Sequence, residues 1–146
     1  MEQELALPAV DDLDTGGHWQ AARRHELAVR VCARCGLVLH MPKAYCHACG
    51  SWDTRWQVVA PVGRLYSWTT VLRQIHPAFP VPYTIVLVEL AEAPAARLVG
   101  HLPGTPELSA GLPMVATFTD VAGISLPVWR PAPPGPAGPG SGTIRS

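Results

Sequence analysis

The sequence predicts a mainly β protein, in which a short helix and a small metal-binding lobe precede a closed antiparallel barrel of five strands. Two observations support this fold class. The chain has two Cys-x-x-Cys-Gly motifs, at residues 32–36 and 46–50, and they use all four of its cysteines. After Gly50 the sequence is a series of short apolar stretches, rich in β-branched and aromatic residues and separated by Gly and Pro, with almost no helical pattern.

The four cysteines, Cys32, Cys35, Cys46 and Cys49, are expected to hold one metal ion. Thiolates are soft ligands that suit zinc, and a glycine after each pair lets the backbone turn around the metal. Four sulfurs make a closed shell, which is typical of a structural metal. Two disulfides or a redox pair would use the same residues, but two matched motifs favour one metal site. Zinc is the default, and the sequence does not separate it from iron in a rubredoxin-like site.

An acidic, flexible arm is expected over residues 1–13, followed by a short helix over about 17–25. Asp14 or Thr15 is the candidate cap of this helix, because a short polar side chain accepts hydrogen bonds from the first free N–H groups. A helix of this length is not stable alone. We therefore expect it to pack against the rest of the chain.

The lobe over residues 14–55 is predicted to be a rubredoxin-like zinc ribbon. Apolar residues alternate with others from Leu27 to Val31, which indicates a strand that enters the first cysteine motif. Residues 37–39 are apolar and return from it. The result is a β-hairpin with Cys32 and Cys35 at its tip.

The barrel is predicted over residues 56–131. Five antiparallel strands within about 75 residues favour a closed barrel over an open sheet. The prolines between residues 76 and 82 exclude a central strand there. Residues 132–146 are rich in Pro and Gly and are expected to be a disordered tail. The expected barrel strands are residues 64–75, 83–90, 97–102, 115–121 and 124–129.

Charge and hydropathy narrow the classes of function. The formal net charge is zero, but residues 15–75 carry eight basic residues against two acidic ones. That excess suits an anionic ligand such as a phosphate, or it serves only to solvate a small lobe. The barrel is neutral overall, which argues against nucleic acid. No apolar run is long enough for a membrane span and no signal peptide is evident, so we expect a soluble cytoplasmic protein.

No catalytic residue can be assigned from the sequence. There is no cysteine outside the two motifs, and the acidic residues of the barrel are scattered over separate segments. The chain also lacks a glycine-rich phosphate loop. These residues favour a binding or scaffolding protein over an enzyme that acts alone.

The order of motifs over residues 14–131 resembles the zinc-ribbon plus OB-fold proteins associated with acyl-CoA enzymes. The cysteine motifs alone are generic. More specific are Gly63-Arg64-Leu65-Tyr66-Ser67-Trp68-Thr69, His76-Pro77-Ala78-Phe79 and the Pro82-Tyr83 pair that opens an apolar strand. The resemblance implies that the barrel is a five-stranded OB-fold barrel.

The resemblance further implies a non-catalytic accessory subunit in lipid or sterol metabolism. Members of the family accompany a thiolase, an acyltransferase or a side-chain aldolase of the thiolase fold, and some also work with a hydratase. They help to shape the acyl-CoA site, so a CoA thioester is expected at the shared interface of a hetero-oligomer. Any hydratase partner is expected to be a separate chain. A nucleic-acid-binding module remains the alternative, since zinc ribbons and OB-folds serve that role elsewhere.

Three residues are expected to face the partner or its ligand: Trp19, His76 and Phe79. Trp19 lies on the short helix, and Phe79 is at the centre of a proline-rich loop. Large aromatic side chains are frequent anchors of protein interfaces, and the prolines reduce the entropy that docking costs. The opposing interpretation is that Trp19 and Phe79 cover the two ends of the chain's own core.

Overall fold

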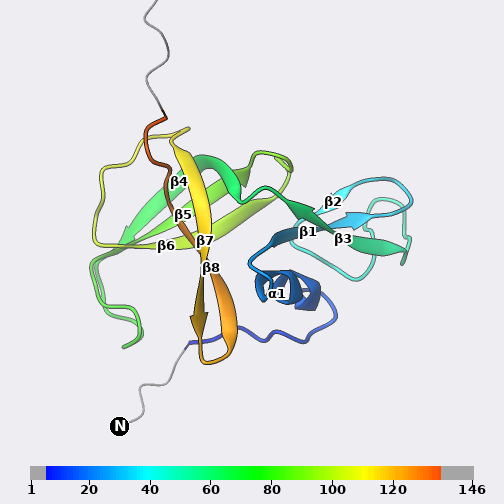
Figure 1. Cartoon of the computed structure of the whole chain (residues 1–146), viewed down its shortest axis with the longest axis horizontal. Coiled ribbons are helices and arrows are strands. Elements are labelled where there is room, and N and C mark those ends of the chain that lie inside the picture. Colours follow the sequence, from blue (N-terminus) through cyan, green and yellow to red (C-terminus); the bar gives the residue numbers. More distant parts are fainter. Residues whose placement is uncertain (1–5, 136–146) are drawn as a thin grey trace, which may run out of the picture.

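The computed structural model describes residues 6–135, which form one helix and two antiparallel sheets (Figure 1). The mainly β architecture, with a short helix and a cysteine-bearing lobe before a five-stranded sheet, confirms the predicted fold class. Residues 1–5 of the expected arm and 136–146 of the expected tail lie outside the described residues. In chain order the elements are α1 (Gly16–Ala22), β1 (Leu27–Cys32), β2 (Val38–Leu39), β3 (Thr54–Val59), β4 (Val62–Val71), β5 (Tyr83–Leu90), β6 (Arg97–Pro103), β7 (Pro113–Val121) and β8 (Ile124–Pro131).

The first sheet has the strand order β2-β1-β3 and carries the cysteine motifs. Val31 of β1 pairs with Val38 of β2, so the turn between them holds the first motif, as predicted. β1 also pairs along its length with β3, starting with Leu27 opposite Val59. The boundary that the sequence suggested after residue 55 therefore falls inside β3, and residues 56–59 pair with the lobe.

β1 joins the lobe to the barrel. Its alternating residues are typical of a strand with one buried face, yet all six of its residues are buried. Leu27, Val29 and Val31 belong to the same hydrophobic core as the barrel strands. The opposite face lies against α1, where Nδ1 of His18 donates a hydrogen bond to the carbonyl of Ala28 at 3.1 Å. Both faces of β1 are therefore covered by the protein itself.

α1 lies between the first sheet and the hairpin of β7 and β8 (Figure 1). It is shorter than predicted because His25 adopts a left-handed backbone conformation, with φ of 57°, which ends the helical path. Thr15 is the N-cap residue, but its side chain does not cap the helix. Instead the carboxylate of Asp12 accepts hydrogen bonds from the backbone N–H groups of Asp14 and Thr15.

The second sheet has the order β6-β5-β4-β7-β8, and its two end strands contact each other and close it into a barrel. A bulge at Tyr66 interrupts the pairing of β4 with β5. Gly63 permits the close approach of these strands, since a Cβ there would lie 2.3 Å from the carbonyl oxygen of Glu89. The buried core includes Leu65, Val86, Val88, Leu90, Met114 and Trp129.

The helix described within residues 6–135 has seven residues, and no helix in that range is long and apolar enough to cross a membrane.

Candidate functional site

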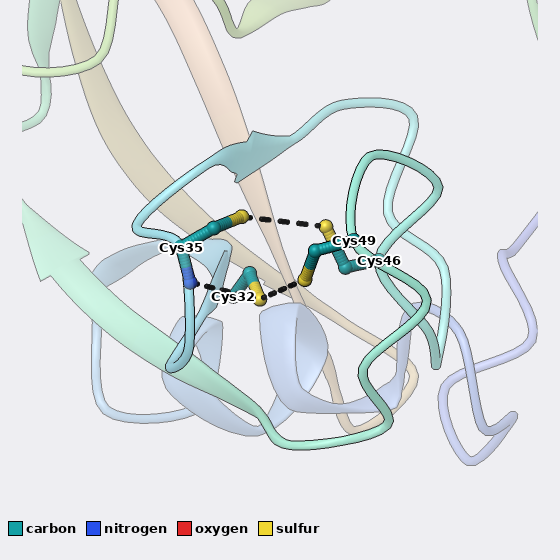
Figure 2. Close-up of side chains that lie close together, drawn as sticks. All are labelled: Cys32, Cys35, Cys46 and Cys49. Carbon is teal, nitrogen blue, oxygen red and sulfur yellow. Dashed lines mark hydrogen bonds between the residues drawn. The ribbon is translucent and has the colours of Figure 1, made fainter.

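The four cysteine sulfurs converge on one point of the lobe (Figure 2). All four lie within 4.8 Å of one another, and the pairs Cys32–Cys49 and Cys35–Cys46 are each separated by 3.6 Å. A tetrahedral zinc–thiolate centre with bonds of about 2.3 Å places its sulfurs about 3.8 Å apart. The donor set and its spacing therefore fit a four-coordinate metal ion held by the residues predicted from the sequence.

The two cysteine motifs are built in the same way. In each, the glycine N–H donates to the carbonyl of the first cysteine, as Gly36 does to Cys32 at 2.9 Å and Gly50 to Cys46 at 2.8 Å. Gly36 and Gly50 have φ angles of 75° and 70°, a conformation that a side chain disfavours. Each pair of thiols is thus fixed by a tight turn whose final glycine is required by the backbone.

Local hydrogen bonds prepare Cys32 to be a ligand. The backbone N–H of Cys35 lies 3.5 Å from its sulfur and lowers the pKa of the Cys32 thiol to about 7. Burial and the neighbouring thiols raise the pKa of the Cys35 thiol to about 11, so Cys32 is the first of this pair to become a thiolate. The thiolate is the form that binds a metal. Apolar packing around the centre is slight, because the only buried residues of its small core are Cys32, Leu39 and Cys46 within the described part of the chain. A small apolar core of this kind is typical of domains that a bound metal stabilises.

A second candidate site is a groove beside α1 and the barrel, which we call the aromatic groove. Its volume is about 420 Å³, and its walls come from α1, the loop before β5, and strands β5, β6 and β8. The residues that define it are Trp19, Phe79, Tyr83, Val99, His101 and Trp129.

The structure brings two of the three predicted partner-facing residues to this groove. Trp19 and Phe79 both line it, and both are half-buried. His76 is not part of the wall, but its ring lies 6.0 Å from that of Phe79 and its Nδ1 accepts a hydrogen bond from the N–H of Ala78. The aromatic residues therefore line one groove, whereas the opposing interpretation put them at separate ends of the core.

Sequence reasoning missed the polar residues of the groove. His101 lies on β6 opposite Ile85, and Trp129 reaches the same place from β8. The alternation along β6 puts Val99 and His101 on one face, which is the signal that could have identified them. Their meeting with Trp129 depends on barrel closure, which no local pattern encodes.

An adjoining groove of about 320 Å³ separates the lobe from β6. It shares His18 and Trp19 with the aromatic groove and is bordered by Arg30 and Arg97. Burial lowers the pKa of His18, so this histidine is neutral at physiological pH. Arg30 is buried, with its guanidinium 5.5 Å from the ring of Trp56 and hydrogen-bonded to the carbonyls of Leu13 and Asp14.

Several of the eight basic residues between positions 15 and 75 have partners within the protein. Lys43 pairs with Asp14 at 3.0 Å, Arg24 pairs with Glu26 at 3.0 Å, and Arg30 serves the fold as described above. Part of the excess positive charge noted in the sequence is therefore paired within the protein.

One group of polar side chains resembles a catalytic arrangement without having its geometry. Asp120 accepts a hydrogen bond from the hydroxyl of Ser125 and lies 3.5 Å from Nε2 of His25. Activation of a serine requires a base in contact with its hydroxyl, with the acid behind that base. Here the carboxylate stands between the other two, so the group holds the β7–β8 hairpin to the end of α1.

Comparison with known proteins identifies both parts of the chain. Residues 19–53 match the family model of the ChsH2 rubredoxin-like zinc ribbon domain, and residues 56–119 match that of the ChsH2 C-terminal OB-fold domain. The solved structure titled "Ltp2-ChsH2(DUF35) aldolase" superposes with a TM-score of 0.75 and 34% identity, covering 86% of this chain and 98% of that one.

Two curated proteins are also similar. A probable enoyl-CoA hydratase alpha subunit of Thermomonospora curvata is 35% identical over 130 residues, which cover 87% of this chain and 40% of that protein. The 3-oxo-4,17-pregnadiene-20-carboxyl-CoA hydratase alpha subunit of Mycobacterium tuberculosis is 30% identical over 120 residues, with coverages of 81% and 38%. The chain thus spans about two fifths of the length of these relatives. The resemblance inferred from its motifs is confirmed, and the chain belongs to the ChsH2 family of DUF35 proteins, in which a rubredoxin-like zinc ribbon precedes an OB-fold domain.

Proposed function

We propose that this chain is a non-catalytic subunit that binds a thiolase-fold acyl-CoA enzyme and helps to shape its acyl-CoA site. The observation that carries the proposal is the aromatic groove, with the exposed Val99 in its wall, on a chain similar to a component of a solved aldolase. The metal is zinc in this proposal, and its role is to hold the lobe in shape.

The barrel surface supports a docking role. Val99, at the edge of the groove, is 69% exposed, and Tyr66, Trp68, Leu72 and Ile75 are also exposed large apolar residues. Exposed apolar surface on a small domain is a frequent mark of an interaction site, and aromatic residues are common energetic anchors of such sites. A stable interface buries roughly 800 Å² on each partner, which needs more surface than the groove alone. The partner is therefore expected to cover the groove and the strand faces next to it.

Relatives suggest the class of reaction. One similar structure is named an aldolase and two similar proteins are named hydratase alpha subunits, and both hydratase names refer to CoA thioesters. We therefore propose a hydratase as a second partner, alongside the thiolase-fold enzyme, in a hetero-oligomer. The CoA thioester would lie where the enzyme meets this chain. Exposed arginines left for its phosphates are Arg23, Arg34, Arg55 and Arg73.

A nucleic-acid-binding role has less support. Such a role needs a basic groove with stacking aromatic residues. On the outer face of β5 and β6, the one arginine, Arg97, is paired with Glu89 at 3.0 Å and stacked on Tyr66 at 3.7 Å. Its charge is thus already partnered.

Affinity capture from the source organism tests the proposal. The tagged chain should retain a thiolase-fold enzyme, and adding the chain to that enzyme should raise its turnover of a CoA thioester. The variant Val99→Lys should lose the partner, because it puts a charge into an apolar interface. Val58→Lys is the matched control, since Val58 is 54% exposed on β3 and borders neither groove. Capture of no acyl-CoA enzyme, or equal capture by both variants, would contradict the proposal.

A further inference from the structure

Two buried nitrogen atoms of the described residues have no hydrogen-bond partner: Nε2 of His101 and Nε1 of Trp129. Both residues line the aromatic groove. Trp129 is among the most completely buried side chains, with 1% of its surface exposed. Buried polar atoms in native proteins are nearly always hydrogen-bonded, because an unsatisfied one costs free energy. Two such atoms at one groove therefore indicate that a group from outside the chain forms hydrogen bonds with them.

The walls of the groove select a neutral occupant. None of the residues that line it is an aspartate, glutamate, lysine or arginine. Apart from its two histidines, the side chains of the wall are aliphatic or aromatic, as with Ile85, Leu98 and Leu126. A charged ligand would lose its hydration here without an opposite charge to replace it. His18 adds no positive charge, because it is buried in its neutral form.

The two nitrogens define the polar part of the occupant. An indole N–H is a donor only, so the atom that meets Trp129 must be a hydrogen-bond acceptor. A neutral histidine can carry its proton on Nε2 and then donates in the same way. A carbonyl oxygen has two lone pairs and no proton, and it can accept from one of these donors or from both.

We propose that the aromatic groove binds a neutral, largely apolar small molecule that presents a carbonyl oxygen to Trp129 and His101. The groove volume of about 420 Å³ lies within the range of roughly 300–1,000 Å³ that is usual for small-molecule sites. Both nitrogens are shielded from water, so entry of the ligand requires a shift of the rings that pack on His101. These are Phe79 and Tyr83, at ring-centroid distances of 5.5 Å and 5.0 Å.

This binding is a property of the chain alone, and it goes beyond the subunit role because it needs no partner enzyme. A direct test uses the metal-loaded chain with no enzyme added. The chain is labelled with ¹⁵N and titrated with 2-acetylnaphthalene and with 2-ethylnaphthalene, two molecules of similar size and shape that differ in the carbonyl oxygen. The ketone should bind about three- to tenfold more tightly, which is the usual net effect of one buried neutral hydrogen bond. The indole N–H signal of Trp129 should move downfield with the ketone only.

Matched variants assign the preference to its donor. Trp129→Phe should lower the preference for the ketone, whereas Trp52→Phe should keep it, because Trp52 is 72% exposed on the metal-binding lobe. If Trp129→Phe does not fold, the response of the Trp129 signal in the parent chain still decides the question. Any one of three results would overturn the proposal: equal affinity for the two naphthalenes, no change in the Trp129 indole N–H shift on adding the ketone, or no saturable binding. The last result is also what an ordered water molecule in the groove would give.

Discussion

The indole of Trp129 lies directly against Gly100, in the gap between the two end strands of the barrel sheet. A Cβ added at Gly100 would come within 2.8 Å of Cδ1 of Trp129 and 2.9 Å of Cγ2 of Val86. Because β6 and β8 are not hydrogen-bonded neighbours, side chains must fill this gap. The missing side chain at Gly100 therefore gives Trp129 its place in the core and closes the barrel.

Gly100→Ala should destabilise the chain by about 1–3 kcal/mol, the usual cost of adding a methyl group to a filled core. Chemical denaturation of the metal-loaded chain measures this change. Val99→Ala is the control, since its side chain is exposed and its loss should change the free energy of unfolding by less than about 0.5 kcal/mol. An unaltered stability of Gly100→Ala would show that Trp129 moves aside freely.

Cys46→Ser should abolish stoichiometric metal binding and unfold the lobe. Cys46 is fully buried, and the four sulfurs form the centre around which both motifs turn. Structural zinc contributes of the order of 10 kcal/mol to the folding of small metal-dependent domains, far more than this lobe's apolar core supplies. Metal analysis and circular dichroism measure the effect, with His47→Ala as an exposed neighbouring control. A folded Cys46→Ser chain that keeps one metal ion would contradict a four-cysteine site.

The metal ligands could be predicted from the sequence because their geometry is local. Each Cys-x-x-Cys-Gly motif closes its own turn, and Gly36 and Gly50 are required there by a positive φ. The short helix and the strands were also predictable from residue periodicity. The early end of the helix was not, because the positive φ of His25 has no signal in the sequence.

The parts that could not be predicted depend on which segments meet in space. Residues 56–59 fall within the segment predicted to be the barrel, but they pair with β1, because a sequence pattern identifies a strand without identifying its neighbour. His101 and Trp129 have no sequence motif in common. They face one groove only because β6 and β8 close the barrel.

His18→Asn should make the stability of the chain less sensitive to acid. Burial lowers the pKa of His18 in the folded state, whereas in the unfolded chain it returns to about 6.5. Below that pH the unfolded state binds a proton that the folded state does not bind. The free energy of unfolding therefore falls as the pH drops, by at most about 1.4 kcal/mol per pH unit. Asparagine keeps a donor for the carbonyl of Ala28 and does not titrate.

Denaturation of the parent and His18→Asn chains at pH 7.5 and pH 5.5 measures this difference. His40 retains part of the acid sensitivity in both chains, because burial lowers its pKa in the same direction. Parallel losses of stability in the two chains would show that His18 becomes solvated and protonates without unfolding.

Single-stranded nucleic acid should bind weakly. Arg97 is paired with Glu89, and the neutral barrel offers few cations for phosphates, so little counterion release is available to drive association. Titration of labelled oligonucleotides at physiological salt measures the affinity. A dissociation constant of roughly 1 µM or tighter would favour the nucleic-acid-binding alternative, since non-specific binding under these conditions is usually weaker.

Phe79→Ala separates a docking role of the aromatic groove from a purely structural one. Phe79 is half-buried, on a loop, and its ring contacts those of Tyr83 and His101. Removal of such a side chain should cost the isolated chain about 1 kcal/mol or less, because solvent already reaches it. At an interface the same ring would be fully buried, and loss of an aromatic anchor typically costs about 2 kcal/mol or more of binding free energy.

We therefore expect Phe79→Ala to weaken the complex with the acyl-CoA enzyme by at least about tenfold and to lower the turnover of that enzyme, while the melting temperature of the isolated chain stays nearly unchanged. Val58→Ala, on the far strand of the lobe sheet, should change neither quantity. Calorimetry of the isolated chains and titration of the complex provide the two readings. A loss of about 3–5 kcal/mol in the isolated Phe79→Ala chain, as for a core phenylalanine, would mean that the ring supports the fold and that the enzyme docks elsewhere.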